Sequence, residues 1–480
     1  MEKTKILFAS AEASPFAKTG GLADVAGSLP AALGRLGADV RLVLPKYMDI
    51  PLEYTEAMEY LGYIYVDLGW RHQFCGIFSL VVGERIAYFI DNEYYFKRDN
   101  LYGYPDEAER YTFFCKALLQ MLPLTGFQPD VIHCNDWHTG IVSLLLNSGF
   151  MREYLGKDVK SVFTIHNLRY QGVFPKQVFS ELIGLNWGYF HRDGVEFYDG
   201  INFMKAGIVY SDTITTVSRS YAEEIKQPYY GEQLNELLER RSENLYGILN
   251  GIDPAENDPS NDRRLFAPYD AENPEGKLVN KACLQKQLRL PQNAGVPLIG
   301  VISRLVDQKG FDLIAHVLDE LLSEDIQLVV LGTGERRYEE MFRHAAARYP
   351  GKVSANIRFD GTLAQRIYAG SDMFLMPSLF EPCGLGQLLA LRYGSVPVVR
   401  ETGGLRDTVR TWNEFDKTGN GFTFANYNAH DMLYTIKRAL GFYRKKAVWA
   451  EIVRSCMKED FSWNRSAMEY MELYEMPARL

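Results

Sequence analysis

The sequence lacks the features that mark membrane-bound and secreted proteins. No segment approaches the ~18 consecutive apolar residues that a membrane span needs, so no membrane partner is expected. The N-terminal run MEKTKILFASAEASP has two early lysines, but its apolar part is short and is interrupted by Glu12. This run is too short for the core of a signal peptide. We therefore expect a cytoplasmic protein.

Paired cysteines and paired acidic residues are also missing. The six cysteines stand at positions 75, 115, 134, 283, 383 and 456 and form no Cys-x-x-Cys pair. Neither a zinc cluster nor a disulfide framework is indicated. There is no Asp-x-Asp, which disfavours chemistry through a carboxylate-bound metal. His133, Asp136 and His138 in HCNDWHTG have no further ligand cluster beside them, so we expect neither a metal nor a cofactor.

The chain has no excess of positive charge. The 52 lysines and arginines against 61 aspartates and glutamates leave a net charge of −9. A protein without a basic excess cannot offset phosphate repulsion over a long interface, so nucleic acid is not an expected partner. A small anionic ligand held by a few local cations remains compatible with this charge.

The 480 residues are too many for one hydrophobic core, and the pattern of the chain divides them in two. Apolar strand-like runs alternate with helix-like runs from residue 5 to about 218, and the alternation restarts at residue 297. The segment 250–276 is rich in Pro, Asn and Asp and reads as a junction. The pattern predicts two doubly wound α/β domains with parallel sheets, whose ligands bind beyond the carboxyl ends of the strands.

A short motif occurs once in each half. Thr-Gly-Gly-Leu stands at residues 19–22 and again at 402–405, each time between a strand-like and a helix-like run. Exposed backbone N–H groups at such a turn favour an anion, and glycine permits close approach. We expect each half to present one of these turns to a ligand. Lys18 adds a cation to the first copy.

Two further motifs suggest an anion site in the second half. In SRLVDQKGFD, Arg304 ends a strand and Lys309 precedes a helix, so both could face one anion, although both could also be solvated surface cations. In FEPCGLGQL, Glu381 precedes a Gly-rich helix start that could seat a diphosphate on the N–H groups of residues 384–386. The alternatives there are a glutamate stabilised by the helix dipole and a Cys383 that only packs.

These motifs occur in the order and spacing of one family. FASAEASPFAKTGGLADVAGSLPAAL, HCNDWHTG, TIHNLRYQG, ILNGID, SRLVDQKGFD, FEPCGLGQL and ETGGLRDTV together resemble the bacterial glycogen synthases, which use ADP-glucose and are related to plant starch synthases. The resemblance spans nearly the whole chain. It implies the GT-B architecture, in which two Rossmann-like domains face a deep cleft. The absence of a plastid transit peptide favours the bacterial type.

The resemblance also implies domain bounds, partners and a reaction. Residues 1–248 would form the acceptor-side domain, residues 249–460 the donor-side domain, and residues 461–480 a helix that crosses back onto the first domain. The enzyme would transfer glucose from ADP-glucose to the non-reducing 4-hydroxyl of an α-1,4-glucan such as glycogen, with retention of configuration.

The resemblance also implies which part of the donor some of the site residues contact. Asp136 and His166 would surround the donor glucose with Glu381, while Arg304 and Lys309 would hold its diphosphate. The other implied contacts to the donor are Lys18, Gly20, Gly21, Asn250, Cys383, Gly384, Leu385, Gly386, Thr402, Gly403 and Gly404.

The sequence departs from the family at two positions. Many relatives have Thr at position 386, so backbone N–H groups must serve the phosphate here. The second glutamate of the wider retaining GT-B pattern is replaced by Leu389. With no carboxylate placed as a nucleophile, the expected mechanism is front-face attack within a short-lived ion pair.

Three alternatives stay open at this stage. One is a related transferase with a different donor or acceptor. A second is a glucan phosphorylase carrying pyridoxal phosphate. The third is a sensor of nucleotide sugars or an NAD-binding protein, although no Gly-x-Gly-x-x-Gly opens the first βαβ unit.

Overall fold

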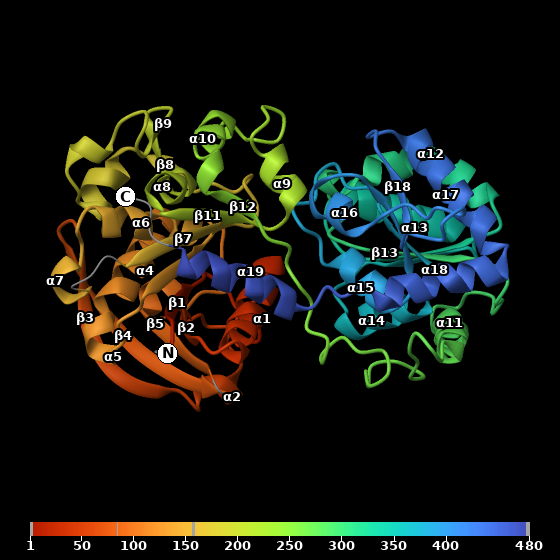
Figure 1. Cartoon of the computed structure of the whole chain (residues 1–480), viewed down its shortest axis with the longest axis horizontal. Coiled ribbons are helices and arrows are strands. Elements are labelled where there is room, and N and C mark those ends of the chain that lie inside the picture. Colours follow the sequence, from red (N-terminus) through yellow and green to blue (C-terminus); the bar gives the residue numbers. More distant parts are fainter. Residues whose placement is uncertain (1–2, 84, 156–158, 477–480) are drawn as a thin grey trace. The chain divides into compact units, whose positions relative to one another are not determined.

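The computed structural model describes residues 3–83, 85–155 and 159–476 (Figure 1). The chain divides into two compact units. The first unit comprises Met1–Asn250 and Trp463–Leu480, and the second comprises Gly251–Ser462. Across the described ranges, no helix is long and apolar enough to span a bilayer.

The first unit is built on a nine-stranded sheet with the order β12-β11-β7-β6-β1-β2-β5-β4-β3. All neighbouring pairs are parallel except those that involve β4, which runs antiparallel to both β3 and β5. The strands are β1 (Lys5–Ala9), β2 (Asp39–Pro45), β3 (Glu59–Leu68), β4 (Arg71–Val82), β5 (Arg85–Asp91), β6 (Val131–Asn135), β7 (Lys160–Ile165), β11 (Thr213–Thr216) and β12 (Leu245–Gly247). A second sheet has the order β8-β10-β9, with β8 (Val173–Pro175), β9 (Glu196–Phe197) and β10 (Gly200–Asn202).

Helices and short turns connect these strands. Helix α1 (Gly21–Arg35) shows how: its apolar residues recur at helical spacing, and Leu22, Val25 and Leu29 are buried. The other helices of the first unit are α2 (Leu52–Thr55), α3 (Glu93–Phe96), α4 (Glu107–Gln120), α5 (Leu122–Thr125), α6 (Ile141–Asn147), α7 (Arg152–Leu155), α8 (Phe203–Tyr210), α9 (Arg219–Glu224) and α10 (Asn235–Arg240), with the single turns η1 (Trp137–Thr139), η2 (Phe179–Ile183), η3 (Trp187–Tyr189) and η4 (Ser242–Asn244).

The last helix of the chain, α19 (Trp463–Glu475), belongs to the first unit. It lies beside α1, as Figure 1 shows. The hydroxyl of Tyr474 lies 2.7 Å from Nδ1 of the buried His133 in β6. The ammonium of Lys160 donates to the carbonyl of Met476, just after the helix, at 2.7 Å. Polar bonds from two strands therefore join the end of the chain to the sheet.

The second unit is a six-stranded, fully parallel sheet with the order β15-β14-β13-β16-β17-β18. In chain order this is 3-2-1-4-5-6, the arrangement of a dinucleotide-binding Rossmann sheet. The strands are β13 (Leu298–Ile302), β14 (Gln327–Leu331), β15 (Val353–Asn356), β16 (Met373–Met376), β17 (Val396–Arg400) and β18 (Phe422–Phe424). The four central strands, β14, β13, β16 and β17, are almost wholly buried, as strands covered on both faces must be.

Each strand of the second unit is followed by a helix that packs back onto the sheet. These helices are α12 (Phe311–Ser323), α13 (Arg336–Arg348), α14 (Gly361–Gly370), α15 (Gly386–Arg392), α16 (Gly403–Thr408) and α17 (Ala429–Tyr443), with the turn η5 (Asp307–Lys309) before α12. Helix α11 (Glu275–Gln287) precedes β13, and α18 (Lys446–Lys458) follows α17. The core of this unit joins residues of α12, α17 and α18 to the strands. The predicted fold class, two Rossmann-like α/β units in one chain, is confirmed.

Candidate functional site

In the parallel part of each sheet the strand order reverses at one point, and several candidate residues lie beside the two strands that flank this switch point. In the first unit the flanking strands are β1 and β6. The segment that carries Lys18 follows β1, and Asp136 directly follows β6. In the second unit the flanking strands are β13 and β16, which are followed by Arg304 and Glu381. Ligands of open α/β sheets bind at this point, beyond the carboxyl ends of the strands.

Asp136 and His166 lie together in the first unit. Asp136 Oδ1 accepts the backbone N–H of His166 at 2.8 Å and that of Asn167 at 3.4 Å. Asp136 itself has a φ of +57°, which a non-glycine residue rarely adopts. Such strain is often kept at functional sites. Burial raises the pKa of Asp136 to about 7, although the two N–H groups act to lower it.

His166 is a neutral imidazole with a defined tautomer. Its Nε2 lies 2.8 Å from Asn135 Oδ1, while the amide nitrogen of Asn135 donates to the carbonyl of Ala9. The oxygen of Asn135 is therefore the acceptor, and Nε2 of His166 carries the proton. Burial lowers the pKa of His166 to about 3. The ring can donate through Nε2 and accept through Nδ1, but it carries no charge near neutral pH.

The first Thr-Gly-Gly-Leu turn differs from the expectation. Two of its N–H groups are already bonded within the protein: those of Thr19 and Gly20 donate to Glu12 Oε2 at 2.6 and 3.2 Å. The carboxylate of Glu12 therefore takes the place that an anionic ligand would have at these N–H groups. Lys18 is half exposed and pairs with Asp24 at 2.5 Å, while Gly21 is the first residue of α1. The charge of Lys18, rather than the N–H groups of Thr19 and Gly20, is what this turn offers to a ligand.

Asn250 ends the first unit. It is buried, and its side-chain oxygen has no hydrogen-bond partner among the described residues. A buried amide oxygen without a partner is costly, so it is a candidate acceptor for a ligand.

In the second unit, Lys309 and Glu381 form an ion pair. Lys309 Nζ lies 2.6 Å from Glu381 Oε2, and the hydroxyl of Ser378 donates to the same oxygen at 3.0 Å. The side chains are 17% and 8% exposed, so water screens the pair only weakly. Arg304 is exposed, and its guanidinium makes no hydrogen bond or ion pair with any residue in the described ranges. Of the two expected cations, Lys309 is therefore paired with Glu381, and Arg304 is free to bind a ligand.

The loops that carry Lys309 and Glu381 are tied to each other. Gly310 has a φ of +74°, and a Cβ there would meet the carbonyl of Pro377 at 2.0 Å. The N–H of Leu379 donates to the carbonyl of Gln308 at 2.9 Å. Only glycine allows this approach of two backbones. The close packing explains how an ion pair can form between groups 72 residues apart.

The second Thr-Gly-Gly-Leu turn also departs from the expectation of exposed N–H groups. Gly404 N–H donates to the backbone carbonyls of Glu381 and Pro382, both at 3.1 Å. Gly403 has a φ of +45°, and a Cβ on it would meet the Glu381 carbonyl at 2.0 Å. Thr402 is fully buried and precedes α16. This turn supports the backbone of Glu381.

The glycine-rich segment beside Glu381 is held by a residue that the sequence argument overlooked. Gln387 donates from its side-chain nitrogen to the carbonyls of Cys383 and Gly384 and to the hydroxyl of Thr408. Cys383 is buried, Leu385 precedes α15, and Gly386 opens that helix. A Cβ at 386 would touch Met376 and Phe374 at 3.3 Å, which favours the glycine found there.

Sequence reasoning missed further residues near the strand ends. Glu12 was quoted only as an interruption of an apolar run, yet it anchors a turn. Phe359 follows β15 and is 90% exposed, which is unusual for a phenylalanine. The signal for both was their position just after a strand. Within the described part of the chain, no group of three His, Cys, Asp or Glu residues could hold a metal ion.

Two Rossmann-like units in one chain, each with polar residues at its switch point, are the arrangement of the GT-B glycosyltransferases, and the matches to known proteins place the chain in this class. The family model of the starch synthase catalytic domain matches residues 5–240, and that of glycosyl transferases group 1 matches residues 286–454. The glycogen synthase of Clostridium novyi is 56% identical over 98% of both chains, and that of Geobacillus stearothermophilus is 54% identical over 98% of this chain and 97% of its own.

Solved structures agree with these matches. The catalytic domain of starch synthase IV from Arabidopsis thaliana, bound to ADP and acarbose, superposes with a TM-score of 0.92 at 34% identity and covers 98% of this chain and 99% of its own. Sucrose-phosphate synthase from Thermosynechococcus elongatus, at 17% identity and a TM-score of 0.61 over 98% of both chains, shows the shared fold alone.

The chain belongs to the glycogen synthase family of glycosyltransferases. Enzymes of this family take a glucosyl unit from a nucleotide sugar and add it to a glucan. The resemblance stated from the motifs is confirmed. The phosphorylase, sensor and NAD-binding alternatives receive no support from these matches.

Proposed function

We propose that the protein is a glycogen synthase that transfers glucose from ADP-glucose to the non-reducing 4-hydroxyl of an α-1,4-glucan, with retention. The observation that carries this proposal is the Lys309–Glu381 pair at the β13/β16 switch point, with the exposed Arg304 after β13. The pair provides a cation for the leaving diphosphate and a carboxylate for the sugar. In this proposal, residues 249–460 form the donor-side domain and residues 1–248 form the acceptor-side domain. Residues 461–480 belong with the acceptor-side domain.

The chemistry follows from the charges that develop during transfer. Breaking the bond between glucose and phosphate leaves negative charge on ADP and positive charge on the sugar. Arg304 and Lys309 are placed before the reaction to stabilise the diphosphate, which is worth roughly 3–4 kcal/mol for a well-placed donor. Lys18 adds a third cation. Because these cations are part of the protein, the proposal requires no metal and no cofactor.

The sugar side would use the remaining groups. Asp136, His166, Glu381 and Asn250 are assigned to the donor glucose and its anomeric carbon. None of the carboxylates is assigned as a nucleophile. The acceptor hydroxyl attacks from the face that ADP leaves, and the departing phosphate takes its proton.

Phe359 offers a stacking surface for the base of the donor, on which the larger ring system of a purine stacks more strongly than a pyrimidine. It follows β15, which lies two strands from β13, or roughly 10 Å at the usual strand spacing. An exposed ring at this edge can stack on a base, and stacking is worth roughly 1–3 kcal/mol. The Arabidopsis enzyme that superposes on this chain carries ADP. We assign Phe359 to the adenine and propose ADP-glucose as the donor. The six free thiols support a reducing, cytoplasmic setting.

Steady-state kinetics with two donors test this proposal. ADP-glucose and UDP-glucose are compared with glycogen as the acceptor, in wild type and in the Phe359→Ala variant. We expect wild type to prefer ADP-glucose in kcat/KM, and the variant to lose about ten-fold or more of that preference. A wild type that used UDP-glucose equally well would contradict the donor assignment. A variant with an unchanged preference would remove Phe359 from the site.

A further inference from the structure

Glu12 lies in the first unit, three residues after β1, and is 4% exposed. Its Oε2 accepts the N–H groups of Thr19 and Gly20. Its Oε1 accepts the hydroxyls of Thr19 and Tyr102, both at 3.0 Å. We propose that Glu12 is a positioning residue for the transfer reaction, which holds the turn so that Lys18 reaches the ADP part of the donor. This inference rests on the proposed role of Lys18.

The chemistry of the turn supports this role. Successive backbone N–H groups that point to one side form a seat for an anion. Here the anion is a side chain of the protein, and a carboxylate that accepts several N–H and O–H bonds makes strong, charge-assisted ones. The seat is filled by Glu12 before any ligand arrives. Its function is therefore to fix the turn, and the adjacent Lys18 becomes the group presented.

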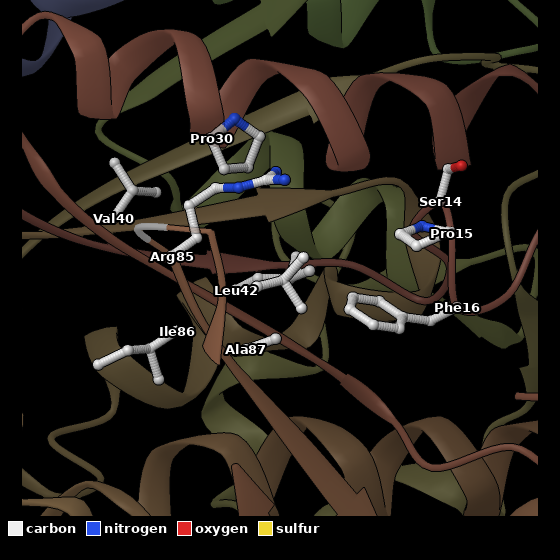
Figure 2. A pocket seen from close by; sticks show the side chains of 10 residues that line it. Ser14, Pro15, Phe16, Pro30, Val40, Leu42, Arg85, Ile86 and Ala87 are labelled. Carbon is white, nitrogen blue, oxygen red and sulfur yellow. The ribbon is translucent and has the colours of Figure 1, made fainter. Parts of the chain in front are cut away.

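The segment between Glu12 and Lys18 is held separately, by apolar packing. Phe16 contacts Phe89 and Tyr54 edge-on, with ring centroids 5.0 and 5.2 Å apart. Figure 2 shows Ser14, Pro15 and Phe16 bordering a small hollow lined mainly by apolar side chains. Its volume, about 20 Å³, is too small for a sugar or a nucleotide. Loss of the Glu12 carboxylate would therefore loosen the turn locally and leave the packed segment in place.

Tyr102 extends the contact toward the sugar-side residues. Its ring lies 4.8 Å from that of His138, which in turn stacks on Trp137 at 4.0 Å. Trp137 directly follows Asp136. Glu12 thus joins the Lys18 turn to the segment that carries Asp136, within one unit. Such a connection is what a residue that sets relative positions requires.

The first test replaces Glu12 with Gln, which keeps its size and removes its charge. We expect the KM for the nucleotide-sugar donor to rise about ten-fold, with the KM for the glucan changed less than two-fold. The matched control is Asp212→Asn, because Asp212 also accepts a backbone N–H and a hydroxyl, both from Ser161 at 2.7 Å. Asp212 lies at the amino end of β11, away from the switch point, so this variant keeps the donor KM of wild type.

A double-mutant cycle tests separately whether Lys18 binds the donor and whether Glu12 acts through Lys18. Lys18→Gln should raise the donor KM, and adding Glu12→Gln should raise it no further, because both changes remove one function. If the two effects multiply, Glu12 does not act through Lys18 and the inference is wrong. If Lys18→Gln raises the donor KM and Glu12→Gln does not, the inference alone is wrong. A Lys18→Gln variant with the wild-type donor KM would overturn the role of Lys18, and this inference with it.

A milder variant covers the case in which Glu12→Gln folds poorly. Thr19→Val keeps the backbone N–H bond to Glu12 and removes only the hydroxyl bond. We expect a donor KM raised about three-fold with an unchanged melting temperature. A wild-type donor KM in this folded variant would contradict the positioning role.

Discussion

Arg304 and Lys309 both follow β13, but their surroundings differ. Lys309 is mostly buried against Glu381, and Arg304 is exposed. Removal of one partner of a buried ion pair leaves the other charge unpaired and lowers stability, while removal of an exposed charge changes stability little. The two cations of the proposed diphosphate site should therefore be separable by experiment.

Arg304→Ala and Lys309→Met should both reduce kcat about 100-fold or more, because each removes a group aimed at the leaving ADP. Their stabilities should differ. Lys309→Met leaves the carboxylate of Glu381 buried without its cation, which costs about 3–5 kcal/mol. Arg304→Ala should unfold at the wild-type denaturant midpoint. Turnover assays and urea unfolding check both variants, and equal midpoints would show that the Lys309–Glu381 pair does not stabilise the unit.

Asp136 and the buried histidines respond to pH in opposite directions. Burial raises the pKa of Asp136 to about 7, so the folded state holds a proton that the unfolded state has lost between pH 4 and 7. Its contribution to stability is present at low pH and is lost as the pH rises through 7. Burial lowers the pKa of His133, His138 and His166 to about 3, so their contribution is lost as the pH falls below 6.5.

The Asp136→Asn variant isolates the first effect. Asparagine can still accept the N–H of His166 but cannot ionise. The free energy of unfolding of the variant, relative to wild type, should therefore rise between pH 4 and pH 8, by about 4 kcal/mol at most. Urea unfolding at the two pH values measures this difference. A difference that does not change with pH would mean that Asp136 is not held at a raised pKa.

At the scale of the element, the two Thr-Gly-Gly-Leu turns share a sequence but differ in packing. In the first turn, an added Cβ on Gly20 would meet nothing within 4 Å. In the second, the same atom on Gly403 would collide with the carbonyl of Glu381. The first turn is fixed by a side chain, Glu12, and the second by its own backbone bonds to the segment of Glu381. In the first unit, therefore, the glutamate holds the turn, whereas in the second unit the turn holds the backbone of the glutamate.

Alanine substitutions should separate the two turns. Gly20→Ala should lower the free energy of unfolding by less than about 1 kcal/mol, since it adds a methyl group to open space at a helix cap. Gly403→Ala should lower it by roughly 1–3 kcal/mol and reduce turnover, because the added atom displaces the Glu381 backbone. Thermal unfolding and turnover assays measure both. Equal losses in the two variants would contradict the packing difference.

How well each element could be predicted from the sequence depended on its pattern. The buried parallel strands, such as β6 and β13, are continuous apolar runs and were found. The β3–β4 hairpin was missed, because aromatic residues such as Tyr63, Tyr65 and Phe74 cover its exposed face. These rings stack on one another and on His72 across the two strands. An exposed face made of aromatic rings removes the polar alternation by which a half-buried strand is recognised.

At the scale of the whole molecule, the repeated feature is a set of parallel strands with a switch point and polar residues beside it. In the sequence, Asp136, His166, Arg304 and Glu381 each follow an apolar run, which is the pattern of a strand end. The sequence could not show that the N–H groups of Thr19, Gly20 and Gly404 are already bonded, since their acceptors, Glu12 and the carbonyl of Glu381, come from other loops. Contacts between loops depend on the folded chain and leave no local pattern.

The central claim is that this chain moves glucose from ADP-glucose to the non-reducing end of an α-1,4-glucan with retention. Time-resolved proton NMR of the enzyme with ADP-glucose and maltohexaose tests it most directly. We expect ADP and maltoheptaose to form in equal amounts, with one new α-1,4 linkage and no free glucose. Release of free glucose, a β-anomeric product or glucose 1-phosphate would contradict the account.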